Sequence, residues 1–140
     1  MTEILAHSSF RGLATGEAID SIHDHLDGLW ADAPFVQDMD QMTFTTAVIE
    51  AATNIVQHAE PAKELAVELG VDISVQAALL QARVSAFNAK PPFGPMEPGV
   101  PDDESESGRG LALIQALVTT VTFERQDGTN TWILSRSSQG

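Results

Sequence analysis

Three polar residues recur at intervals of four positions within a largely apolar stretch of the sequence: Glu50, Asn54 and His58. If this stretch is helical, side chains four residues apart lie on one face. A carboxylate can act as a general base, and an amide oxygen is a hard ligand that suits Mg²⁺. An ordinary solvated helix face would show the same spacing, because helix surfaces are polar by default. The spacing alone leaves both interpretations open.

A second motif, Ser107-Gly108-Arg109-Gly110-Leu111, precedes an apolar segment that predicts a helix over residues 110–118. Glycines allow backbone N–H groups to approach an anion closely, and a helix N-terminus favours negative charge. Arg109 adds a cationic donor, although a simple tight turn would use the same glycines. Residues 89–107 contain five of the seven prolines and show no periodicity. Such a long segment is typical of a lid over a bound ligand.

The apolar periodicity around these motifs predicts the elements that must position them. Apolar residues recur at three and four positions in the helical segments, and at every second position in the strands. The predicted elements follow in this order: a strand over 7–13, helices over 15–31 and 41–59, strands over 65–75 and 81–87, the lid, a helix over 110–118, and strands over 119–125 and 131–136.

This order of elements predicts an α+β fold. Hairpins and helices segregated to one face indicate a two-layer sandwich of a mostly antiparallel mixed sheet with helices on one side. The length of 140 residues suits one domain, covering residues 1–140, with a single core.

The charge of the chain excludes some classes of partner. Seven Lys and Arg stand against 20 Asp and Glu, which gives a net charge of −13. We therefore expect no direct binding to nucleic acid or to an anionic membrane, because both need clustered cations. No Lys or Arg lies between Arg11 and Lys63. The first predicted helix then presents Asp20, Asp24 and Asp27 opposite its apolar face, as a docking surface for a basic protein.

The sequence also restricts the location and the covalent chemistry of the chain. It contains no cysteine, which excludes disulfides, a thiolate nucleophile and cysteine-based zinc sites. It shows neither a signal peptide nor an apolar run of membrane-spanning length. These features predict a cytoplasmic protein.

The two motifs together resemble those of a known superfamily. The segment from Glu50 to Ala59 resembles the N box of the histidine-kinase-like ATPases, which have the Bergerat fold, and residues 107–111 resemble their second glycine box. The short lid, the chain length and the Asn-x-x-x-His-Ala form are similar to those of the bacterial anti-sigma-factor serine/threonine kinases. The resemblance covers essentially the whole chain.

The resemblance implies a function as a partner switch. Family members bind ATP with Mg²⁺ under the lid, bind and inhibit a sigma factor, and commonly form homodimers. They also phosphorylate a serine or threonine of a STAS-type anti-anti-sigma protein, and this phosphorylation releases that antagonist from the kinase. The protein would regulate transcription without contacting DNA.

The resemblance also implies roles for individual residues. By matching position, Glu50 would activate the substrate hydroxyl as a base, and Asn54 would bind the Mg²⁺ that bridges the ATP phosphates. His58 would lie near the phosphates or the lid. The remaining matched residues would form the phosphate side of the nucleotide site: Ser107, Gly108, Arg109, Gly110 and Leu111.

One part of the sequence departs from the family pattern. The family's first glycine box reads Asp-x-Gly-x-Gly or Ala, whereas this chain reads Asn88-Ala89-Lys90-Pro91-Pro92-Phe93. Asn88 can accept a hydrogen bond from the adenine amino group, but it lacks the carboxylate charge. Lys90 would either reach a phosphate or fill the adenine pocket. The alternative to a kinase is therefore a catalytically decayed module that sequesters a protein partner without ATP turnover.

Overall fold

The computed structural model describes the chain over residues 3–92 and 106–137, and it describes side-chain surroundings in the second range from residue 112 onward. The elements have the predicted types and order. They are β1 (Ala6–Leu13), α1 (Gly16–Asp32), α2 (Asp38–His58), β2 (Glu68–Gln76), β3 (Leu79–Phe87), α3 (Glu106–Leu117), β4 (Thr120–Gln126) and β5 (Thr129–Ser137).

The strands form one sheet in the order β1-β2-β3-β5-β4. Each pairing between these strands is antiparallel. The described sheet is therefore entirely antiparallel, whereas the sequence predicted a mixed one. Short turns join β2 to β3 and β4 to β5, and a short turn can only bring strands together antiparallel. The longer connection through α3 carries β4 to the sheet edge, and β5 then returns beside β3. The predicted α+β sandwich is otherwise confirmed.

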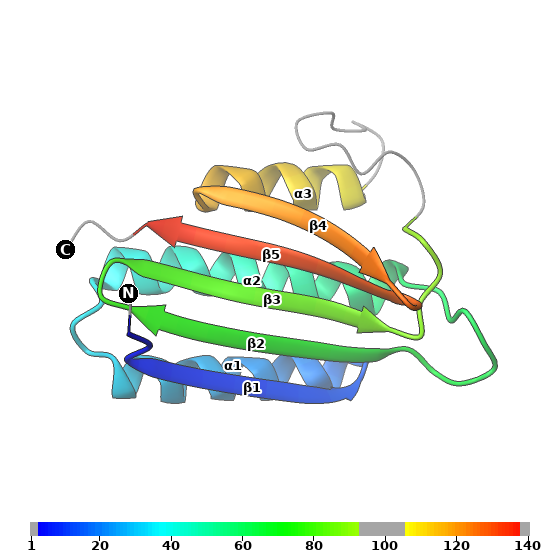
Figure 1. Ribbon diagram of the computed structural model, residues 1–140, viewed down its shortest axis with the longest axis horizontal. Helices are drawn as coiled ribbons and strands as arrows, with labels where there is room; N and C mark the ends of the chain where they lie inside the picture. Colours follow the sequence, from blue (N-terminus) through cyan, green and yellow to red (C-terminus); the bar gives the residue numbers. More distant parts are fainter. Residues whose placement is uncertain (1–2, 93–105, 138–140) are drawn as a thin grey trace.

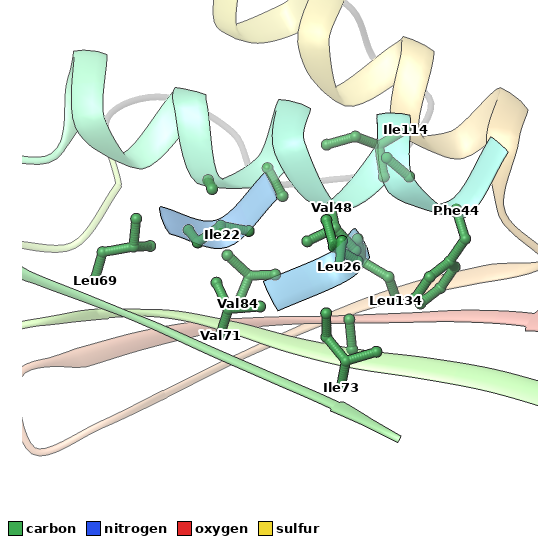
Figure 2. Close-up of a cluster of buried hydrophobic side chains, with 14 of the residues drawn as sticks. Ile22, Leu26, Phe44, Val48, Leu69, Val71, Ile73, Val84, Ile114 and Leu134 are labelled. Atoms are coloured by element: carbon green, nitrogen blue, oxygen red, sulfur yellow. The ribbon is translucent and has the colours of Figure 1, made fainter. Parts of the chain in front are cut away.

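The helices cover one face of the sheet, with α3 lying beside α2 (Figure 1). The core fills the space between the two layers. Every second residue of β2 points into it from the sheet, and the apolar stripes of α1 and α2 meet these residues from above (Figure 2). The largest fully buried side chains include Ile22, Leu26, Phe44, Leu69 and Leu134. No helix in the described ranges is both long and apolar enough to cross a membrane.

The opposite face of the sheet carries cross-strand ion pairs. The Arg11 Nε donates to the Glu68 carboxylate at 2.8 Å, and an Arg83 guanidinium nitrogen lies 3.7 Å from a Glu124 carboxylate oxygen. The Arg11 guanidinium also lies 3.7 Å from the centroid of the Phe87 ring. These exposed pairs contribute little to stability, but they leave both arginines already engaged.

Candidate functional site

Helix α2 carries the first predicted motif. It forms because its apolar residues repeat at helical spacing against the sheet, and it ends at His58, before Pro61. Glu50 and Asn54 are half-buried, whereas His58 is exposed. The carboxylate and the amide thus lie at the border of the core-facing stripe rather than on the most solvated part of the helix.

The described residues form no cluster of three acidic or histidine side chains that could hold a metal by themselves. The half-buried amide of Asn54 carries one oxygen of the hard type that Mg²⁺ prefers. Mg²⁺ usually keeps several waters and takes few protein ligands, with substrate phosphates completing its shell.

The segment that replaces the first glycine box follows β3 directly. Asn88 has a φ of 59°, in the left-handed region that asparagine tolerates better than most residues. Its side-chain nitrogen donates to the Leu65 carbonyl at 2.6 Å. Because a carbonyl can only accept, this bond fixes which end of the amide faces Leu65. The side-chain oxygen of Asn88, Oδ1, remains as the acceptor, and no described residue donates to it.

The backbone of the same segment is bonded to the end of α2 and to the β4–β5 turn. The Ala62 N–H donates to the backbone oxygen of Asn88 at 2.9 Å, and the Lys90 N–H donates to the Glu60 backbone oxygen at 2.8 Å. The Ala89 N–H donates to the Gly128 carbonyl at 2.9 Å. Lys90 is exposed, so its side chain does not fill a buried pocket in the part of the chain that the structure describes.

The second glycine motif lies inside α3. The helix begins at Glu106 rather than at the predicted residue 110, so Gly108 and Gly110 fall within its first turns. The first N–H groups of a helix have no intrahelical acceptor, and the free donors consequently come from residues around Ser107 rather than only from the glycines. The side chains of Ser107, Arg109 and Leu111 lie outside the described surroundings, as does most of the predicted lid, residues 93–105.

These elements converge at one end of the molecule. Figure 1 shows the last turns of α2, the end of β3, the β4–β5 turn and the start of α3 together at that end. Two open pockets formed by described residues lie in other places on the surface: one beside β1 and α1, and another on the uncovered sheet face. Neither is lined by Glu50 or Asn54.

The cations available to a bound phosphate are few. Arg11, Arg83 and Arg136 are engaged in ion pairs, and Arg125 is bonded to the Asn88–Lys90 segment and to Asn130. In the described ranges, Lys63 and Lys90 take part in no ion pair. Lys63 follows the end of α2 and Lys90 follows the end of β3. Among the described residues, Lys63 and Lys90 are therefore the Lys and Arg side chains not engaged with an acid or with the Asn88–Lys90 segment.

The model of the family described as the histidine kinase-like ATPase domain matches residues 22–136. The match covers well over half of the chain, which therefore belongs to the histidine kinase-like ATPase family.

Among solved structures, the chain is similar to the RsbU and RsbW domains of Rv1364c from Mycobacterium tuberculosis, with a TM-score of 0.65 and 18% sequence identity. The likeness covers 94% of this chain and 33% of that chain, so this chain spans about a third of its length. At this identity the likeness supports the fold alone. No curated protein matches the sequence.

Arg125 and Asn130 are absent from the residues that the sequence predicts for this site. The only available signal is that Asn130 is in phase with Trp132 and Leu134 along β5, which places a polar residue on the apolar face of the strand. That signal indicates a buried amide, but it does not identify its partners.

Proposed function

We propose that the chain is an anti-sigma factor of the ATP- and Mg²⁺-dependent serine/threonine kinase type. It would bind a sigma factor in the cytoplasm, phosphorylate a STAS-type anti-anti-sigma protein, and act as a homodimer. Membership of the histidine kinase-like ATPase family and the resemblance of both motifs to the anti-sigma-factor kinases support this proposal. The observation that carries it is the pair of half-buried residues Glu50 and Asn54 on one face of α2, whose last turns lie at the same end of the molecule as the start of α3.

The proposed chemistry divides among these residues. Phosphoryl transfer depends on positioning and on charge neutralisation more than on covalent chemistry by the protein. Glu50 would accept the proton of the attacking serine or threonine hydroxyl. Asn54 would hold Mg²⁺, which when bound neutralises charge on the phosphates. Lys90, Arg109 and the first N–H groups of α3 would bind the phosphates, and the side-chain oxygen of Asn88 would accept from the adenine amino group.

Asn54→Ala tests the nucleotide site. We expect the wild type to bind ATP in a Mg²⁺-dependent way, and the variant to bind at least about tenfold more weakly because it loses the amide ligand. Isothermal titration calorimetry with and without EDTA measures this difference. Gln57→Ala is the matched control, since it removes an exposed amide from the same helix.

A second candidate function is favoured by a specific observation. The Asn88–Lys90 segment contains none of the family's glycines, and hydrogen bonds hold its backbone on both sides. A decayed module that holds its protein partner without ATP turnover would carry such a change. Absence of ATP binding by the wild type with both Mg²⁺ and Mn²⁺ would select this alternative over the kinase.

Charge reversal on α1 tests the proposed sigma-factor surface. Asp20, Asp24 and Asp27 are exposed, and no cation lies nearby in the sequence. We expect Asp24→Lys with Asp27→Lys to weaken capture of the cognate sigma factor by about tenfold at low salt, and less at high salt. ATP affinity should not change. Glu64→Lys, which reverses an exposed acid outside α1, serves as the control in a pull-down titration, and equal losses in both variants would contradict the assignment.

A further inference from the structure

Arg125 and Asn130 in the β4–β5 hairpin are bonded to the segment that replaces the first glycine box. They face each other as register partners across the hairpin. One guanidinium nitrogen of Arg125, Nη1, donates to the Ala89 carbonyl at 2.9 Å and to the Asn130 side-chain oxygen at 2.6 Å. The Asn130 side-chain nitrogen donates to the Lys90 carbonyl at 2.8 Å. We call this pair the hairpin clamp.

The clamp completes the hydrogen bonding of two consecutive backbone units. The Ala89 N–H donates to Gly128 and its carbonyl accepts from Arg125, while the Lys90 N–H donates to Glu60 and its carbonyl accepts from Asn130. All four backbone polar groups of Ala89 and Lys90 are therefore bonded within the protein. A segment bound in this way cannot change its φ and ψ angles without breaking several bonds at once.

Burial makes the Asn130 side chain specific for this arrangement. Asn130 is 2% exposed and Ala89 is fully buried. The guanidinium of Arg125 can only donate and the Lys90 carbonyl can only accept, so the amide has one permitted orientation. Removing one end of a buried amide leaves its partner without a hydrogen bond, which costs more than the bond itself contributes.

We infer that Arg125 and Asn130 are positioning residues of the nucleotide site, an inference that rests on the proposed function. They hold the backbone that presents the side-chain oxygen of Asn88 and the Lys90 ammonium group. The segment lacks the family's glycines, and the bonds that fix its backbone all run to residues outside it. The hairpin clamp supplies the bonds to the Ala89 and Lys90 carbonyls. Because the segment is already held in place, ATP binding would lose less conformational entropy in ordering it.

Two variants test the clamp through different bonds. Asn130→Asp keeps an acceptor for Arg125 but removes the donor to the Lys90 carbonyl. Arg125→Met keeps the length of an exposed side chain but removes both of its donated bonds. Arg83→Met is the matched control, because Arg83 is also an exposed sheet arginine but pairs with Glu124 instead of with the segment.

Hydrogen exchange of the full chain and ATP titration provide the two readouts. In both clamp variants we expect exchange at the Ala89 and Lys90 amides to rise about tenfold and ATP affinity to fall about three- to tenfold. The KM for ATP should rise while kcat at saturating ATP changes little, since the reacting groups are untouched. Arg83→Met should match the wild type in every measurement.

The possible failures are distinguishable. Faster exchange at unchanged ATP affinity overturns the positioning role, and so does an affinity loss without faster exchange at residues 88–90. A wild type that binds no ATP overturns the proposed function and, with it, the nucleotide role of the clamp. Equal exchange rates in wild type and Asn130→Asp overturn the clamp itself. If Asn130→Asp does not fold, Arg125→Met still gives both readouts, because Arg125 is exposed.

Discussion

Replacing Glu50 by Gln is expected to slow phosphoryl transfer to the antagonist protein by about 10²- to 10⁴-fold, the usual contribution of a general base. Gln keeps the size and the hydrogen-bonding ability of the side chain but cannot accept the hydroxyl proton. ATP affinity should stay within about twofold of the wild type, because the proposed phosphate and metal contacts come from other residues.

The measurement is single-turnover transfer from labelled ATP to the cognate STAS-type protein, with ATP affinity measured separately by calorimetry. Glu60→Gln is the matched control, since Glu60 is an exposed acid just beyond the same helix. A Glu50→Gln variant that transfers phosphate at the wild-type rate would remove Glu50 from the chemistry. A parallel loss of ATP binding would instead assign it a structural role.

Asp40→Ala is expected to cause the largest loss of stability. Asp40 is 6% exposed, and one of its carboxylate oxygens accepts from the Arg136 Nε at 2.9 Å. Arg136 Nη1 also donates to the Leu117 carbonyl at 2.7 Å. The ion pair thus joins the first turn of α2 to β5 and to the end of α3. Removing the carboxylate leaves a partly buried guanidinium without its counter-charge.

We expect Asp40→Ala to lower the free energy of unfolding by about 3 kcal/mol, the low end for breaking a buried pair, because solvent still reaches Arg136. The loss is a substantial part of the ~5–15 kcal/mol that stabilises a typical domain. Urea unfolding measures it, with Asp38→Ala as the control, since Asp38 is an exposed acid in the same helical turn.

A double variant separates the charge effect from lost packing. Asp40→Ala combined with Arg136→Met removes both charges, so it should lose less stability than the two single variants predict by addition. Full additivity, or an Asp40→Ala loss no larger than that of Asp38→Ala, would show that this ion pair does not stabilise the fold.

Much of the architecture follows from local patterns. The alternation of apolar and polar residues in β2 and the helical spacing in α2 determine those elements, because burial of one face imposes the period. The order of elements then restricts the fold to an α+β sandwich. Glu50 and Asn54 are also visible in the sequence, since their spacing of four positions places both on one helix face.

The surroundings of Asn88 could not be predicted from the sequence and are seen only in the tertiary structure. The Lys90 backbone carbonyl accepts a hydrogen bond from Asn130, 40 positions away, and the Ala89 carbonyl accepts one from Arg125, 36 positions away. Hydrogen bonds over such separations leave no period in the sequence, because they depend on where the turns place each backbone. The sequence by itself therefore determined which residues are available for chemistry, and only tertiary packing decided what holds them in place.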